Sequence, residues 1–270
     1  NKGKDMTAIL AIDFCVNILV MADCRVSWKG SRYYPPQDNL QKIYPLGPTG
    51  IFGFAGNIRN AQKIITELRK TSGKLPPSAM EIALSISNCA KKVYSNLKDK
   101  DNEELELMYV ALEYGNVSLV TPNAVFTERI LVKMTSPDFD IQREDGVVRL
   151  GYAKNLPIAL LQRNRVNLMS YGLSPKGLIF QNGIAIGTYC KKLVEYSQSE
   201  VGGMFCIGQI SKSGINWSPY SEGEFELKIE NGQFIQIDQK NNQIIPLKTL
   251  LEFNPGRPDS GHLEINPNWL

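Results

Sequence analysis

The chain has 270 residues, with 30 Lys and Arg against 27 Asp and Glu, which gives a formal net charge of +3. Charges so close to balance argue against nucleic acid or an anionic membrane as a partner. The length suits one large α+β domain that buries a sizeable core without disulfides or metal. We therefore expect a single domain over residues 1–270, with an extended C-terminal segment from about residue 221.

Histidine and cysteine usage narrows the possible chemistry. The single histidine, His262, lies in the polar C-terminal segment, which disfavours a Ser-His or Cys-His catalytic pair and a histidine-rich metal site. The five cysteines are odd in number and lack metal-ligand spacing, and Cys15, Cys89 and Cys206 lie in apolar stretches. This pattern indicates reduced thiols in a cytoplasmic protein with no metal and no cofactor.

Targeting and membrane signals are weak. No uncharged apolar run approaches the roughly 18 residues that a transmembrane helix needs. The start, NKGKDM, is too short and too polar for a signal peptide. We expect neither a membrane nor a nucleic acid among the partners.

The first half of the chain predicts strands followed by two helices. Residues 7–12 and 17–22 read as buried strands around a turn, and residues 25–40 read as a polar loop. Residues 41–56 then form two strands that end in the glycine-rich corner FGFAG. Apolar residues at helical spacing predict helices over 57–70 and 78–98, with Ser78 as the N-cap of the second.

The second half repeats this order. ELELMYVALEYGN and ERILVKM predict strands, and the first is nearly continuous in apolar residues, as when both faces are covered. A strand, a turn at Gly151 and a short helix follow, and then a longer helix that begins at Ser174 and Pro175. GGMFCIGQISKSG and EFELKIENGQFIQID predict the last strands, the latter a hairpin turning at Asn231 and Gly232. The element order predicts an α+β fold with four layers, an αββα sandwich.

Several of these stretches resemble one known group of proteins. TAILAI, ILVMADCRVS, QKIYPL and GIFGFAGNIRNAQKIITEL follow one another over residues 7–70, and SEVGGMFCIGQISKSG adds a weaker match. Together they resemble proteasome β-subunits and the peptidase subunit of the bacterial two-component ATP-dependent protease. Both are N-terminal-nucleophile hydrolases, so the resemblance implies that fold, polypeptide substrates, a homo-oligomeric ring and an ATP-dependent unfoldase as a partner.

The resemblance also implies roles for four residues. Thr7 falls on the nucleophilic threonine, Asp23 on its acidic partner and Lys42 on the lysine beside the nucleophile. Gly56 falls on the glycine whose backbone N–H serves as the oxyanion hole. These positions define the expected catalytic site.

Elementary chemistry is consistent with this grouping. A threonine hydroxyl needs a base, and the free α-amine of the same threonine, with a pKa of about 8, can take the proton. The Lys42 ammonium would disfavour protonation of that amine, and Asp23 would balance the lysine charge in a pocket. A backbone N–H at Gly56 would stabilise the oxyanion by on the order of 3 kcal/mol.

The amine of Thr7 must first be freed, because in the printed sequence Met6 precedes it. Translation from Met6 followed by methionine removal would free the amine, and so would self-cleavage of a propeptide ending at Met6. Either route would give a chain that begins at Thr7.

Other positions depart from the active members. Tyr152 stands where they carry a serine, and Gln198 and Val201 stand where they carry an aspartate and a second serine. The nearby residues that could substitute are Ser197, Ser199 and Glu200. Three hypotheses follow: an intracellular threonine peptidase, a non-catalytic subunit that keeps the fold as a structural or interaction module, and an amidase of the same superfamily that acts on a small amide.

Overall fold

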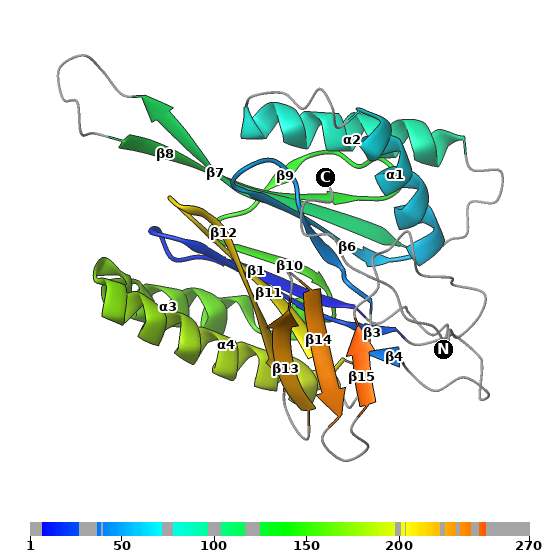
Figure 1. Ribbon diagram of the computed structural model, residues 1–270. Helices are drawn as coiled ribbons and strands as arrows, with labels where there is room; N and C mark the ends of the chain where they lie inside the picture. The colour runs from blue at the N-terminus through cyan, green and yellow to red at the C-terminus, as the bar shows by residue number, and fades with distance from the viewer. Residues whose placement is uncertain are drawn as a thin grey trace.

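The computed structural model places two antiparallel sheets face to face, with a pair of helices on the outer face of each (Figure 1). This mixed α/β class with two antiparallel sheets is as predicted. The residues that the structure describes are 7–26, 37–38, 40–71, 78–96, 104–116, 125–197, 201–202, 204–221, 225–230, 233–238 and 243–246.

The first sheet contains the N-terminal hairpin. Its strand order is β10-β1-β2-β11-β12, and every neighbouring pair is antiparallel. The register sets Ala8 opposite Gly151 and Phe205 opposite Asp23, so the start of β1 and the ends of β2 and β10 lie at the same end of the sheet. The strands span Ala8–Asp13 (β1), Ile18–Asp23 (β2), Val147–Gly151 (β10), Met204–Ser211 (β11) and Gly214–Ser221 (β12).

The second sheet has the order β5-β6-β7-β8-β9 and is also antiparallel throughout. Its register sets Gly56 opposite Leu105, which places the glycine-rich corner at the start of the long strand β7. The strands span Ile43–Pro45 (β5), Gly50–Gly56 (β6), Leu105–Asn116 (β7), Val125–Thr135 (β8) and Gln142–Arg143 (β9).

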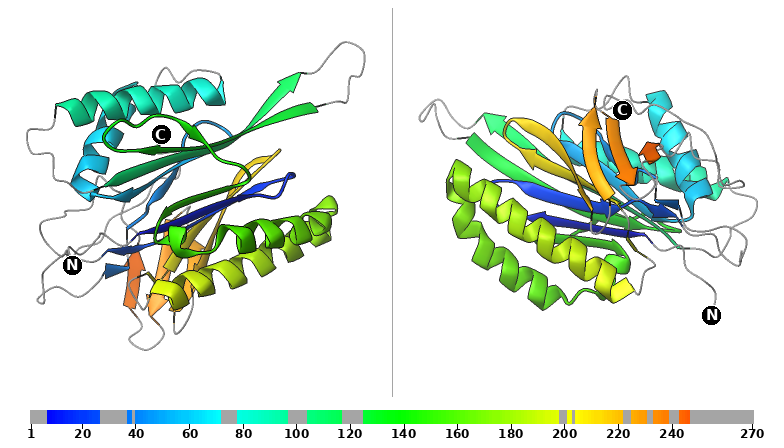
Figure 2. Two further views of the ribbon diagram at one scale, coloured as in Figure 1. Left: turned by 180° about the vertical axis from the view of Figure 1, so that it is seen from behind. Right: turned by 60° about the horizontal axis from the view of Figure 1, so that its bottom comes forward.

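Four α-helices in the described residues form the outer layers (Figure 2). Helices α1 (Ile58–Thr71) and α2 (Ala79–Ser95) cover the second sheet, and α3 (Ile158–Met169) and α4 (Pro175–Ser197) cover the first. The short 3-10 turns η2 (Tyr152–Asn155) and η3 (Ser170–Leu173) flank α3. No helix in the described part of the chain is both long and apolar enough to cross a bilayer.

The core consists of three apolar layers, because successive side chains of a strand point to opposite faces. In β1, Ile9 packs between the sheets, whereas Leu10 packs against the α3–α4 pair. In β7, Met108 packs between the sheets, whereas Leu107 packs under α1 and α2. Both faces of these strands are buried, which explains their nearly continuous apolar sequence.

Four strands, β3, β4, β9 and β12, were missed in the sequence because they are short or polar. The predicted polar loop over 25–40 instead contains strands β3 (Arg25–Val26) and β4 (Gln37–Asp38), which pair with each other. Strands β9 and β12 extend the two sheets at their edges, where only one neighbouring strand supports the pairing.

The segment beyond residue 221 contains a small three-stranded antiparallel sheet, β13-β14-β15. The predicted hairpin is confirmed, because β13 (Phe225–Glu230) pairs with β14 (Gln233–Asp238) with Glu230 opposite Gln233. Strand β15 (Gln243–Pro246) joins this hairpin and was not predicted.

Helix α2 begins where predicted, but not through the predicted cap. Ser78 makes no side-chain capping hydrogen bond. Instead, a carboxylate oxygen of Glu113 in β7 accepts a hydrogen bond from the Ala79 N–H at 3.2 Å. A carboxylate at a helix N-terminus is stabilising for the same electrostatic reason as a local cap, so tertiary structure supplies the group that the sequence placed at Ser78.

Candidate active site

Thr7 lies immediately before β1, at the end of the first sheet where β2 and β10 finish. It is buried, with 5% of its surface exposed. Its carbonyl oxygen accepts a hydrogen bond of 2.8 Å from the Tyr152 N–H, the first residue after β10. The backbone of Thr7 is therefore anchored to the strand end beside it.

The acid and the lysine expected near Thr7 form a buried ion pair. The Lys42 ammonium lies 3.0 Å from Asp23 Oδ1, and the exposed fractions of the two side chains are 1% and 0%. The same Oδ1 accepts a hydrogen bond of 2.8 Å from the N–H of Ala8, the residue that follows Thr7. The structure thus brings Asp23 and Lys42 together against the start of β1.

Lys42 reaches this position from the second sheet. It directly precedes β5, and its carbonyl oxygen accepts a hydrogen bond of 3.3 Å from the Phe54 N–H in β6. Its ammonium also donates to the Arg25 carbonyl oxygen at 2.6 Å. A lysine is seldom fully buried unless it is paired, and here both a carboxylate and a carbonyl compensate the loss of water.

Gly56 is the last residue of β6 in the second sheet, and it lies at the same end of the molecule as Thr7. Its φ of +110° is a conformation that favours glycine, and a Cβ there would lie 2.1 Å from the Glu104 carbonyl oxygen. The preceding residue, Ala55, lies 3.4 Å from the place where a Cβ on Gly151 would be. The glycine corner and the Thr7 strand therefore meet at one end of the space between the sheets.

Gly151 completes this end of the molecule from the β10 side. Its φ is +55°, and a Cβ there would lie 2.0 Å from the Thr7 carbonyl oxygen. Only a residue without a side chain allows β10 to approach Thr7 so closely. The turn predicted at Gly151 is thus confirmed, and the structure adds its contact with Thr7.

The structure describes two of the three positions at which the sequence departs from active members of the family that it resembles, Tyr152 and Val201. Tyr152 packs its side chain against the apolar layer under α3 and α4, and Val201 is fully buried there. The Ser197 hydroxyl lies 2.9 Å from the Val194 carbonyl oxygen and accepts a hydrogen bond of 3.0 Å from the Val201 N–H. Gln198, Ser199 and Glu200 lie outside the described residues.

A charged cluster beside Gly151 was missed in the sequence. Glu106, the second residue of β7, is buried, and its carboxylate accepts a hydrogen bond of 2.9 Å from the Gly151 N–H. The ammonium groups of Lys133 and Lys154 lie 2.7 and 2.6 Å from its other oxygen. The available signal was an acid within the apolar run of β7, where a charge must be compensated.

The environment keeps Glu106 ionised. Burial by itself would raise the pKa of Glu106, but hydrogen bonds from Lys133, Lys154 and the Gly151 N–H together lower it below the ordinary value of 4.5. The pKa of Lys154 is raised because the attraction of Glu106 and Glu104 outweighs the opposing effect of burial. The Glu106 carboxylate and the Lys154 ammonium are thus both charged at neutral pH.

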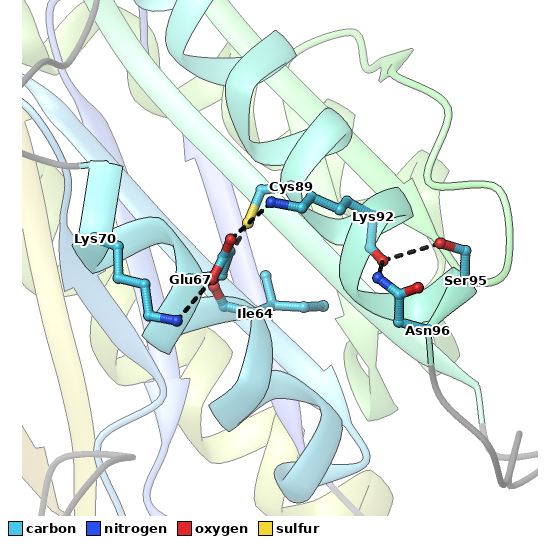
Figure 3. Close-up of polar contacts among 7 residues, drawn as sticks. All are labelled: Ile64, Glu67, Lys70, Cys89, Lys92, Ser95 and Asn96. Carbon is cyan, nitrogen blue, oxygen red and sulfur yellow. Dashed lines mark hydrogen bonds and ion pairs between the residues drawn. The ribbon is translucent and has the colours of Figure 1, made fainter.

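A second polar feature lies on the outer face of the helix pair that covers the second sheet. Glu67 of α1 lies between Lys70 and Lys92, 3.0 Å from each ammonium, and these hydrogen bonds, first that from Lys92, lower its pKa (Figure 3). The hollow around them has a volume of about 720 Å³. Its lining sets the carboxylate of Glu67 against the cations Arg59, Lys63, Lys70 and Lys92. The helices that carry it cover the face of the second sheet that points away from the first sheet (Figure 1).

Cys89 lies near Glu67 and Lys92 in the same helix pair (Figure 3). Its sulfur lies 3.8 Å from the Ile64 carbonyl oxygen (Figure 3). Burial, together with the nearby charge of Glu67, raises its pKa to about 11, so the thiolate is scarce at neutral pH.

Within the described ranges, no group of three or more His, Cys, Asp or Glu side chains is arranged to hold a metal ion. His262 lies outside those ranges. Comparison with models of known protein families gives no match, and no curated protein matches the chain. The geometry at Thr7 is therefore the main indication of function.

Proposed function

We propose that this chain is a threonine-type peptidase of the proteasome-like class, with an N-terminal-nucleophile hydrolase fold and a mature form that begins at Thr7. One observation carries the proposal. The buried Lys42–Asp23 pair is joined through a shared carboxylate oxygen to the backbone of Ala8. Burying two charges costs hydration energy, and here the buried pair brings the Lys42 ammonium to the carboxylate that also binds the residue next to Thr7.

The proposed reaction is acyl transfer from a peptide to Thr7. The hydroxyl oxygen attacks the scissile carbonyl carbon, and the free α-amine of Thr7 accepts the hydroxyl proton. The Gly56 N–H and the Lys42 ammonium stabilise the developing negative charge. The amine then donates its proton to the leaving nitrogen as the C–N bond breaks, and water hydrolyses the ester that remains.

The state of the thiols supports two parts of the proposal: a hydroxyl nucleophile in place of a sulfur nucleophile, and a location in a reducing compartment. All five cysteines lie in described residues and none of them forms a disulfide, as expected for a cytoplasmic protein. Burial raises the pKa of Cys206 to about 12, so neither Cys206 nor Cys89 supplies a thiolate at neutral pH.

The surface of the α3–α4 pair supports a homo-oligomer. Most of the large apolar side chains that the described residues expose lie on these helices and on η3, and exposed apolar side chains are common where proteins meet. The exposed residues there are Ile158, Val166, Tyr171, Ile179, Ile184 and Tyr196. We assign this helix pair to contacts between copies of the chain, in a ring.

A non-catalytic subunit with the same fold is the second candidate. It is favoured by Tyr152 and Val201, which put apolar packing where active members carry polar groups, and by Ser197, whose hydroxyl is engaged at the end of α4. In that case, the Lys42–Asp23 pair only holds the two sheets together.

Covalent labelling of Thr7 distinguishes the two candidates. A chain processed to begin at Thr7 is incubated with a β-lactone electrophile, and the adduct is located by mass spectrometry. A peptidase gives an adduct on the N-terminal peptide. The adduct is retained in Thr7→Ser, absent in Thr7→Ala and absent when Met6 still precedes Thr7. Two results together establish the non-catalytic alternative. The chain processed to begin at Thr7 remains unlabelled, and the chain isolated from its own host still carries residues before Thr7.

A further inference from the structure

Beyond the Asp23–Lys42 pair, two buried carboxylates connect the sheets, one at each end of β1. At the end of β1, Asp13 of the first sheet lies 3.3 Å from Arg129 of β8 and 3.4 Å from Arg165 of α3. At the start of β1, Glu106 of β7 accepts a hydrogen bond from Gly151 of β10. The first connection is remote from Thr7, whereas the second adjoins it.

The Glu106 connection links the two halves of the proposed site through short steps. Glu106 lies opposite Ala55 in the sheet, one residue from Gly56. Across the space between the sheets it holds the Gly151 N–H, and the next N–H, that of Tyr152, donates to the Thr7 carbonyl oxygen. A shift of Glu106 would therefore change the position of Thr7 relative to Gly56.

We propose that Glu106 is a positioning residue of this site, and that its carboxylate, held by Lys133 and Lys154, fixes the separation between the Thr7 hydroxyl and the Gly56 N–H. This inference rests on the proposed function. Glu106 does not touch the substrate or transfer a proton; it acts through the backbone of Gly151 and Tyr152.

The bonding around Glu106 suits this role. Two ammonium groups and one backbone N–H fix the carboxylate from three directions, and charge-assisted hydrogen bonds are shorter and stronger than neutral ones. A buried ion pair contributes little net stability compared with apolar packing. Reaction rates, by contrast, respond steeply to geometry, because a misplacement of about 1 Å can cost about a hundredfold.

The test compares Glu106→Gln with Asp13→Asn. Each removes one buried charge from a connection between the sheets, the first at the start of β1 and the second at its end. The rate of β-lactone labelling is measured on chains that begin at Thr7, at a temperature where each variant is fully folded. Glu106→Gln should lower the rate by about tenfold to a hundredfold, whereas Asp13→Asn should change it less than about twofold. Lys154→Met removes one partner from a half-exposed position and should slow labelling to a smaller extent.

Equal slowing in Glu106→Gln and Asp13→Asn, or no slowing in either, would overturn the inference while leaving the peptidase proposal intact. An inert wild-type chain would instead reject the peptidase proposal. In that case, hydrogen exchange of the backbone amides decides about Glu106. Glu106→Gln must speed exchange at residues 7–9 and 55–57, and Asp13→Asn must speed it at residues 12–18. If each substitution speeds exchange equally at the start and at the end of β1, the positioning role is refuted.

Discussion

The Lys42→Met substitution tests the buried ion pair most directly. Methionine keeps a similar length and an apolar stem but removes the ammonium, which lies 3.0 Å from Asp23 Oδ1 and 2.6 Å from the Arg25 carbonyl oxygen. Asp23 then keeps its hydrogen bond from Ala8 but loses the Lys42 ammonium. The variant thus takes a cationic partner away from a buried carboxylate.

The expected cost is large for one side chain. Breaking one partner out of a buried ion pair destabilises by about 3–5 kcal/mol, because the remaining charge stays buried. The whole free energy of unfolding of a domain is only about 5–15 kcal/mol. Lys42→Met should therefore remove a substantial part of the stability, and the double variant Lys42→Met/Asp23→Asn should lose less than the sum of its two single variants.

Urea denaturation of each variant, followed by circular dichroism, measures these differences. Lys91→Met is the matched control, because the Lys91–Asp140 pair has a similar separation of 2.7 Å but its side chains are 43% and 74% exposed. An exposed pair contributes less than about 1 kcal/mol. If Lys42→Met costs no more than Lys91→Met, the Lys42–Asp23 pair is not buried as described and the argument for the site fails.

Two further predictions concern the same end of the molecule. Gly56→Ala should destabilise the chain by about 1–3 kcal/mol, because alanine strains the positive φ and its Cβ would meet the Glu104 carbonyl oxygen; a midpoint in urea equal to that of the wild type would contradict this. The pKa of Glu106 is lowered in the folded state, so its ionisation contributes stability above its ordinary pKa of 4.5 that is lost as the pH falls through the lower folded value. The difference in unfolding free energy between wild type and Glu106→Gln should accordingly shrink from pH 7 to pH 3, and a difference that is constant or grows would refute the assignment.

Most of the regular elements were predictable, because their signals are local. Strands β1 and β2, the long strand β7 and helices α1 and α4 follow the periodicity of their apolar residues. The cap of α2 was not predictable, since Glu113 comes from a strand distant in the sequence. Strands β4 and β9 are too short to carry a pattern, and only their pairing partners define them.

The candidate site divides in the same way. Asp23 and Lys42 were expected to meet because of a resemblance in motif order, and the structure places them together in an ion pair. The contribution of Glu106 was not predicted, because a strand pattern shows an acid in an apolar run but not the lysines that surround it. Those lysines, Lys133 and Lys154, come from β8 and η2.

By itself, the sequence determined the longer strands and helices and which of their faces are apolar, since these depend on neighbouring residues and on the 2.0 and 3.6 residue periods. Only the tertiary structure decided which charges meet in the interior, namely Asp23 with Lys42 and Glu106 with Lys133 and Lys154. The physical reason is that a buried charge needs a partner in space rather than in sequence, and sheet register and the packing of one sheet on the other set that partner.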